Sequence, residues 1–181
     1  MPPNARNQAE TMGILNDLLQ RVQSVNDGLE KGGIIRDVVI QYPDDILDLQ
    51  KEQLFAGKRS DGEDIRPYYT EDLKPSGYFY SVDTARMYAA WKQTLDYPFE
   101  ANRNPDAPNL YINGRFHDEL GVQFTAETVA VVGTTGYSQQ IVAKYGLDTF
   151  GLMWDNWNEI FFNRGGYDRL MEQIKQTLYV N

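Results

Sequence analysis

One stretch of this chain, residues 109–146, constrains the fold more than any other. It begins with a short apolar run, Leu110–Ile112, which the turn-forming dipeptide Asn113-Gly114 brings to an end. Apolar residues then alternate with polar ones at Leu120, Val122 and Phe124. Because successive side chains of a strand point to opposite faces, this alternation predicts a half-buried strand. The β-branched run at 128–132 predicts a second, more central strand that pairs antiparallel with the first.

A short helix is predicted directly after these strands. Glycines at 133 and 136 end the second strand, and Tyr137, Ile141 and Tyr145 then follow at helical spacing. Ser138 can help to cap the start of this helix, and Gly146 stands where a helix terminator is expected. The stretch therefore predicts a turn, a β-hairpin and a short helix.

The N-terminal part of the chain predicts a long amphipathic helix over residues 9–29. Its apolar residues recur at intervals of three and four: Met12, Leu15, Leu18, Leu19, Val22, Val25 and Leu29. This stripe is either a core-facing side or a short coiled-coil seam. Gly32-Gly33 ends the helix, and residues 34–42 are predicted as a strand in preference to a helix, because glycine precedes them and Pro43 follows.

The remaining segments complete an α+β fold. Helices are predicted over 44–55, over 84–95 with Asp83 as the cap, and over 155–162 and 166–178 near the C-terminus. The polar, turn-rich residues 57–77 and the connector 97–108 predict irregular structure. We expect one domain over residues 1–181, in which 57–108 form an extended insertion or arm.

Composition excludes several classes of protein. Among 181 residues, 26 are acidic and 17 are basic, and the net charge of −9 disfavours a surface that grips nucleic acid. There is no cysteine, so neither disulfides nor thiolate metal sites are possible. No apolar run of transmembrane length and no leader is visible, which predicts a soluble chain without membrane contact. The twelve tyrosines and three tryptophans either form interfaces or fill the core.

Catalytic and metal-binding patterns are weak. His117 is the only histidine, lies at the edge of the strand pattern, and has no cysteine or clearly marked serine or aspartate as a partner. The segment 60–64 lacks the ligand spacing of a calcium loop. Adjacent carboxylates such as Asp118 and Glu119 are explained by the abundance of acids, and we interpret this pair as solvated. We therefore expect no catalytic residue, no metal and no cofactor.

Several of these motifs together resemble a known family. They are Asn113-Gly114-Arg115-Phe116, the alternating strand, Val131-Val132-Gly133-Thr134, and Tyr137 leading to Lys144-Tyr145-Gly146. This series is similar to the head-tail joining or tail-completion proteins of tailed bacteriophages, which also carry a long N-terminal helix. Residues 53–57, Asp61-Gly62 and Pro67-Tyr68-Tyr69 resemble structural proteins of Bacteroides phages, including crAss-like ones. The chain departs from the family pattern in the long segment 57–108, in its extended C-terminal helices, and in having no Glu-Phe-Gly-Thr after the short helix.

The resemblance implies a structural virion protein of the neck, assembled in the host cytoplasm. It would form a homo-oligomeric ring, twelvefold or sixfold, that contacts the portal and other neck or tail proteins. Genomic DNA would pass through this ring only as cargo, and no reaction would be involved. Aromatic residues before and after the hairpin are the interface candidates: Tyr68, Tyr69, Tyr78, Phe79, Tyr80, Trp154 and Trp157. Two alternatives remain open, namely an enzyme that degrades cell-wall glycan with Trp154 and Trp157 as its sugar platform, and a small interaction domain that binds a host protein.

Overall fold

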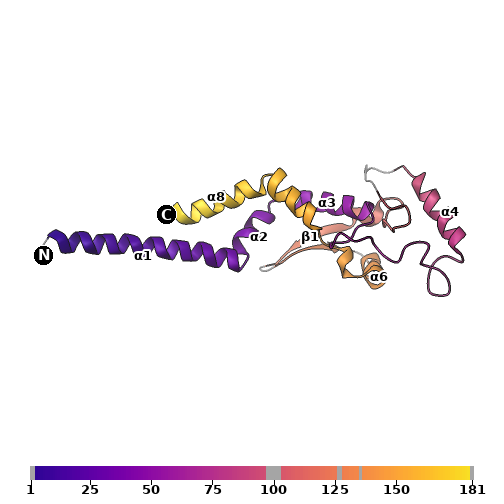
Figure 1. Ribbon diagram of the computed structural model, residues 1–181, viewed down its shortest axis with the longest axis horizontal. Coiled ribbons are helices and arrows are strands. Elements are labelled where there is room, and N and C mark those ends of the chain that lie inside the picture. Colours follow the sequence, from indigo (N-terminus) through magenta and orange to yellow (C-terminus); the bar gives the residue numbers. More distant parts are fainter. Residues whose placement is uncertain (1–2, 97–102, 126–127, 135, 180–181) are drawn as a thin grey trace. The chain divides into compact units, whose positions relative to one another are not determined.

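The computed structural model describes residues 3–96, 103–125, 128–134 and 136–179. These residues form an α+β chain in which a long N-terminal helix, a two-stranded antiparallel hairpin, a short helix and C-terminal helices follow one another (Figure 1). The predicted fold class is therefore confirmed. The contacts group the chain into two compact units. Unit 1 comprises residues 1–42, 124–129 and 161–181, and unit 2 comprises 43–123 and 130–160.

Unit 1 is built from three helices that contact one another: α1 (Pro3–Glu30), α2 (Gly33–Val39) and α8 (Gly166–Tyr179). Arg21 on α1 donates a hydrogen bond from Nη1 to the carbonyl oxygen of Leu178, at 3.1 Å, near the end of α8. The Tyr42 hydroxyl donates to the carbonyl oxygen of Arg164, at 3.2 Å, just before α8 begins. Both ends of α8 are thus held within unit 1, and Figure 1 shows α8 (yellow) running beside α1.

The prediction of a strand over residues 34–42 was wrong, because Gly33–Val39 is helix α2. In a strand, Ile34, Arg36 and Val38 would share one face and Arg36 would point toward the core. In the helix, Ile34 and Val38 are buried, while Arg36 remains partly exposed and donates from Nε to the carbonyl oxygen of Thr125, at 2.6 Å. Packing against α1 and α8 has overridden the β-propensity of this segment.

Helix α3 (Pro43–Phe55) organises the core of unit 2 with Ile46, Leu54 and Phe55 buried. Two glutamines on its inner side are buried as well. Their side-chain amides form hydrogen bonds with the backbone of the segment that follows η1 (Leu147–Thr149). Gln50 accepts from the Gly151 amide at 2.7 Å, and Gln53 donates to the Gly151 carbonyl at 2.9 Å. The Gln53 amide oxygen also accepts from the Met153 amide, at 2.8 Å, which fixes the start of α7 (Trp154–Asn158). The π-helical turn Glu159–Asn163 follows α7.

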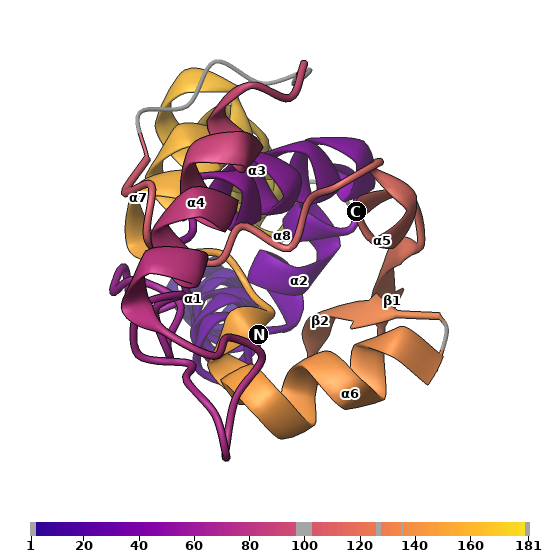
Figure 2. The ribbon, with the colours of Figure 1, turned by 90° about the vertical axis from the view of Figure 1, so that its right-hand side faces the viewer.

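The hairpin consists of β1 (Leu120–Phe124) and β2 (Val129–Gly133), preceded by α5 (Arg115–Asp118) and followed by α6 (Gly136–Tyr145). Figure 2 shows α6 alongside the two strands. A side chain at Gly133 would overlap the side chain of Ser138, so the glycine lets α6 approach the end of β2. His117, expected at the edge of the strand, lies instead on α5.

Residues 57–108 belong to unit 2. Their described part contributes Ile65, Tyr69 and Ala107 to the buried core and includes α4 (Val82–Gln93). The cap of α4 is Ser81, in a reciprocal capping box with Thr84, and not Asp83 as the sequence predicted. Of the predicted connector 97–108, residues 97–102 lie outside the described residues. A reach of this segment to a neighbouring subunit stays a prediction, as does the single domain.

Candidate interaction surfaces

An aromatic pocket of about 420 Å³ lies in unit 2. Its wall includes five aromatic rings, those of Tyr69, Tyr78, Phe79, Tyr88 and Tyr145. The ring centroids of Tyr69 and Tyr88 are 5.1 Å apart, and those of Phe79 and Tyr88 are 5.2 Å apart. Such close, tilted or edge-on ring pairs make a firm apolar wall. The loop before α4, α4 itself and α6 all contribute to this wall.

Lys92 on α4 brings a buried amino group to the pocket, with 2% of the residue exposed. Its Nζ donates to the Tyr69 hydroxyl at 3.2 Å and also hydrogen-bonds Oδ1 of Asn109. Burial, and then the positive charge of Arg103, lower the pKa of Lys92 to about 7. Burial likewise raises the pKa of Tyr69. Burial therefore favours the neutral form of this amino group far more than water does.

A second lysine of the pocket is held by an acid. Lys144 on α6 lies 2.5 Å from Oδ2 of Asp72, and its Nζ is 4.2 Å from the centroid of the Tyr78 ring. Burial and the negative charge of Asp72 raise the pKa of Tyr145, whose ring lines the same wall. The pocket thus combines apolar rings with a charged pair and the amino group of Lys92. This composition suits an apolar or aromatic group that carries a hydrogen-bond acceptor.

The structure brings three of the predicted interface residues together in this pocket: Tyr69, Tyr78 and Phe79. Tyr80 points away from the core, with 82% exposure and the Lys74 ammonium 5.5 Å from its ring. Trp154 and Trp157 lie on α7 and do not line the pocket; Trp154 is 75% exposed, whereas Trp157 is half-buried.

Sequence reasoning missed Asp72, Tyr88 and Lys92 as pocket residues. It placed Lys144 only within the resemblance and Tyr145 on the short helix after the hairpin, without expecting either to meet Tyr78. No local spacing marks these residues, because Asp72 and Lys144 are 72 positions apart in the chain. Only the packing of α4 and α6 in unit 2 makes them neighbours.

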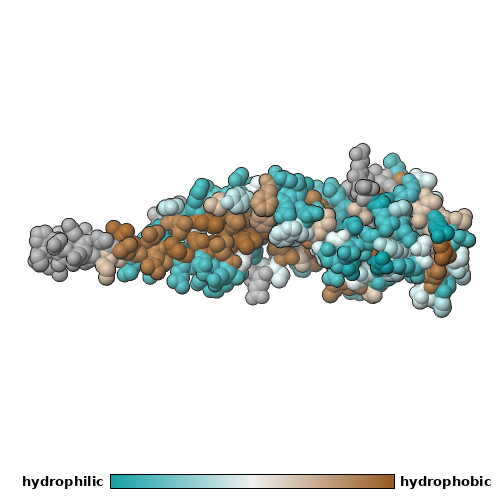
Figure 3. Space-filling model, viewed as in Figure 1, coloured by the Kyte–Doolittle hydropathy of each residue, from teal (hydrophilic) through white to brown (hydrophobic). Residues whose placement is uncertain are grey.

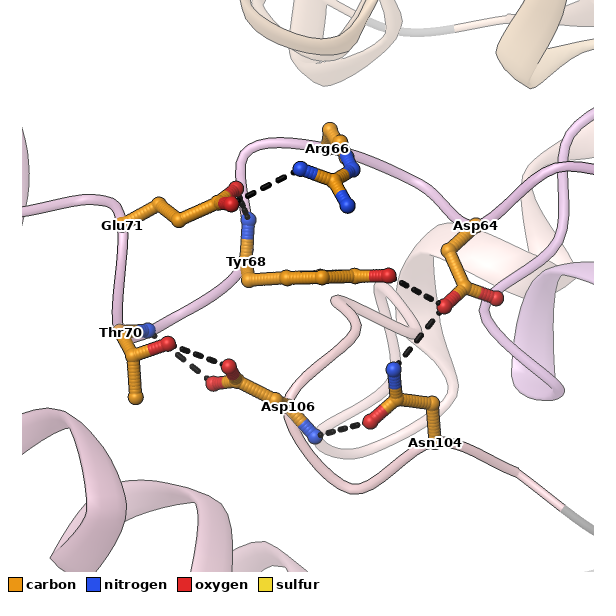
Figure 4. A network of polar contacts seen from close by, with 7 residues as sticks. All are labelled: Asp64, Arg66, Tyr68, Thr70, Glu71, Asn104 and Asp106. Carbon is orange, nitrogen blue, oxygen red and sulfur yellow. Dashed lines mark hydrogen bonds and ion pairs between the residues drawn. The ribbon is translucent and has the colours of Figure 1, made fainter.

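Tyr68 takes part in a polar network beside the pocket wall instead of in the pocket (Figure 4). Its hydroxyl donates to Oδ2 of Asp64 at 2.7 Å, and Asn104 donates to the same oxygen at 2.9 Å. Lys58 lies 2.8 Å from Oδ1 of Asp64. Burial alone would raise the pKa of Asp64, but these hydrogen bonds lower it to about 2. The network holds the loop between α3 and α4 in place.

His117 is buried among aromatic rings. Its Nε2 lies 3.3 Å from the carbonyl oxygen of Asn109, and its ring packs edge-on against Tyr111, with 5.1 Å between centroids. Burial lowers the pKa of His117 to about 4, although the hydrogen bond with Asn109 acts in the opposite direction. In the described residues, no three histidine, aspartate or glutamate side chains are grouped so that they could hold a metal ion. The interpretation of Asp118 and Glu119 as a solvated pair fits Asp118, which is exposed, better than the half-buried Glu119.

The second candidate surface is an apolar face of α1. Six large apolar side chains of this helix are 49–69% exposed: Met12, Ile14, Leu15, Leu18, Leu19 and Val22. Figure 3 shows the hydrophobic side chains that gather along this part of unit 1. Soluble monomers rarely expose an apolar patch larger than ~300–600 Å², so a continuous helical face of this kind is typical of an interaction site.

Comparison with known proteins identifies no matching family model, no similar curated protein and no similar solved structure. Over the residues that the structure describes, no helix has both the length and the apolarity to cross a bilayer.

Proposed function

We propose that this chain is a structural virion protein of a tailed bacteriophage, a subunit of the head-to-tail connector ring between portal and tail. The observation that carries the proposal is the exposed apolar face of α1. A helix with this much uncovered leucine, isoleucine and methionine gains free energy when another protein covers it, at ~25 cal/mol per Å² of apolar surface. A subunit that exists to assemble has such a surface before assembly.

Two further observations support this assignment. The order of a long N-terminal helix, a β-hairpin and a short helix agrees with what the resemblance to head-tail joining and tail-completion proteins implies. Exposed aromatic residues on unit 2, such as Tyr78, Tyr80 and Trp154, offer a second and different surface. A ring closed by rotation needs two unlike surfaces on each subunit, because every contact joins one side of a subunit to the other side of its neighbour.

In this proposal the protein acts in the virion neck after assembly in the host cytoplasm, with the portal and other neck or tail proteins as partners. Genomic DNA is cargo that passes through the ring. The net charge of −9 suits this passage, since an acidic lumen does not bind a moving polyanion. No catalytic step and no cofactor are part of the proposed role.

The test is the oligomeric state of the purified chain, alone and mixed with its portal and neighbouring neck proteins. Native mass spectrometry and negative-stain electron microscopy are expected to show closed rings of six or twelve copies. A chain that remains monomeric at every concentration and with every one of these partners contradicts the proposal.

The pocket of unit 2 favours a second candidate, a small interaction domain that binds a host protein. Its wall of five rings and the buried Lys92 could receive an aromatic or apolar side chain of a partner. Lys92→Met together with Tyr88→Ala would then abolish recovery of a host protein from infected cells and leave virion assembly intact. In the ring proposal the same double variant leaves the set of recovered host proteins unchanged.

A further inference from the structure

We propose that α1 pairs in parallel and in register with α1 of a second copy of this chain, through an apolar seam that contains one asparagine, Asn26. The inference goes beyond the proposed ring, because a pair of identical seams is a twofold contact that is separate from the unlike surfaces that close a ring, and it gives the identity, direction and register of that contact. The seam consists of Met12, Leu15, Leu19, Val22, Asn26 and Leu29.

The spacing of the seam is that of a coiled coil. Its members are separated alternately by three and four residues, which are the a and d positions of a heptad repeat, with Met12, Leu19 and Asn26 at a. Residues at this spacing form a narrow line along one side of a helix, so that a second helix with the same line can interlock with it. The sequence allowed the apolar stripe to be either a coiled-coil seam or a core-facing side. In the structure, the seam and the side of α1 that packs in the core are different sides of the helix.

A different side of α1 packs within unit 1. Arg21 hydrogen-bonds the end of α8, Val25 is half-buried, and a side chain at Gly28 would meet Ile34 of α2 at 2.8 Å. At about 100° per residue, these three positions lie roughly 120° around the helix from the seam. The packing of α1 within unit 1 therefore leaves the seam uncovered.

The seam itself is exposed. Met12 and Leu19 at a positions are 63% and 64% exposed, and Leu15 and Val22 at d positions are both 53% exposed. Leu29, at the end nearest α2, is 36% exposed. The neighbouring Leu18 is 49% exposed, so the seam and this residue form one apolar surface that a second copy would cover.

Asn26 decides the direction and register of pairing. It is exposed at an a position, and its Nδ2 donates within its own helix to Oε1 of Glu30, at 2.9 Å. A single buried asparagine at an a position specifies register, because it is satisfied best by the same asparagine of the other helix. In an antiparallel pair Asn26 would face apolar residues near Leu15 and lose this partner.

The surroundings of the seam suit a second copy. Asn16, Gln23 and Glu30 flank it on one side and Leu18 and Val25 on the other. In a parallel pair these two sides face each other, so Glu30 lies opposite Val25 of the second copy and no like charges meet. Asp17 is on the outer side and already pairs with Arg21 at 3.0 Å. A parallel, in-register pair places a twofold axis along the two helices, so each copy offers the same seam to the other.

Because the chain contains no cysteine, disulfide trapping tests the inference directly. Under mild oxidation, Leu19→Cys is expected to form covalent dimers at least tenfold faster than Ser24→Cys, since residue 19 meets its own copy across the seam and residue 24 faces away from it, and both variants keep Asn26. Equal rates for the two variants overturn the inference. Faster trapping in a mixture of Met12→Cys and Leu29→Cys than in either variant alone also overturns it, because that result requires antiparallel helices.

Failure of this inference is distinguishable from failure of the proposed function. Rings seen by electron microscopy without trapping at residue 19 contradict the α1 pairing and leave the connector proposal standing. Trapping at residue 19 in a chain that never forms rings with its neck partners supports the pairing and contradicts the connector. Leu19→Asp gives a second readout, since it is expected to reduce association without lowering the free energy of unfolding of the isolated monomer.

Discussion

The Nζ atom of Lys92 lies 3.2 Å from the hydroxyl oxygen of Tyr69, and both residues are buried. The contact joins α4 to the loop that precedes it and places an amino group against the aromatic wall of the pocket. A charged ammonium at this position is costly because burial removes its hydration. The protonation of Lys92 should therefore be visible in the stability of the protein.

Lys92 predicts that stability increases from pH 7 to about pH 9.5. Over this range the unfolded chain keeps Lys92 protonated up to its ordinary pKa of 10.5, whereas the folded chain releases the proton above a pKa of about 7. The unfolded state then binds more protons, so the free energy of unfolding rises with pH, by at most ~1.4 kcal/mol per pH unit. Urea unfolding at several pH values is expected to show this rise in the natural chain and not in Lys92→Met. Identical slopes for both proteins would contradict the assignment.

His117 predicts a loss of stability in acid. The folded-state pKa of about 4 lies below the ordinary value of 6.5, so between these values the unfolded chain takes up a proton that the folded chain does not. Stability therefore falls as the pH drops from 6.5 to 4. His117→Gln lacks this contribution, and the difference in unfolding free energy between the two proteins should change across that range and be constant above pH 7. A difference that is constant down to pH 4 argues against a neutral, buried His117.

We expect the polar network around Asp64, shown in Figure 4, to stabilise the fold. Replacing it with asparagine removes the charge that accepts hydrogen bonds from Tyr68, Asn104 and Lys58. A loss of about 1–3 kcal/mol in the free energy of unfolding at pH 7 is expected. Because its folded pKa is lowered to about 2, this contribution is present above the ordinary value of 3.8 and is lost as the pH falls toward 2. The matched control is Asp83→Asn, whose side chain is 89% exposed and lies 3.9 Å from Arg86, and which should change stability by less than ~0.5 kcal/mol.

Gly77 precedes the pocket residue Tyr78, at a position where any side chain would clash with Asp72. A methyl group there would lie 2.2 Å from the backbone of Asp72, the residue that pairs with Lys144. Gly77→Ala is expected to lower the free energy of unfolding by about 1–3 kcal/mol, since the backbone around Asp72 must shift. Gly121→Ala on β1 is the control, because nothing lies within 4 Å of its added methyl. Thermal unfolding of both variants checks the expectation, and equal melting temperatures would refute it.

We expect a substitution at Trp154 to weaken assembly without weakening the fold. At 75% exposure its removal leaves the core intact, so Trp154→Ala should change the free energy of unfolding by less than ~0.5 kcal/mol. As a predicted interface residue it should nevertheless reduce the fraction of assembled rings in native mass spectrometry. Leu147→Ala, which is 74% exposed and is not an interface candidate, serves as the control. A variant at Trp154 that assembles as well as this control removes the residue from the interface.

Periodicity in the sequence was sufficient for the hairpin and for most helices. The alternation at Leu120, Val122 and Phe124 and the stripe that begins at Met12 are local patterns, and the structure has a strand and a helix there. The strand prediction for residues 34–42 was wrong because the local signals, β-branched side chains between Gly33 and Pro43, favour a strand, whereas residues 33–39 are helix α2. What decided between strand and helix was the burial of Ile34 and Val38 against α1 and α8, which no local window contains.

The two candidate surfaces also depend partly on local sequence and partly on tertiary packing. The sequence by itself determined the apolar stripe of α1, its heptad spacing and the asparagine within it, because these depend only on the order of residues along one helix. Only the tertiary structure decided which side of that stripe is covered by α8 and α2 and which remains exposed. It alone brought Lys92, Asp72 and Lys144 to one pocket, since the contacts between them span distant parts of the chain and arise from the packing of unit 2.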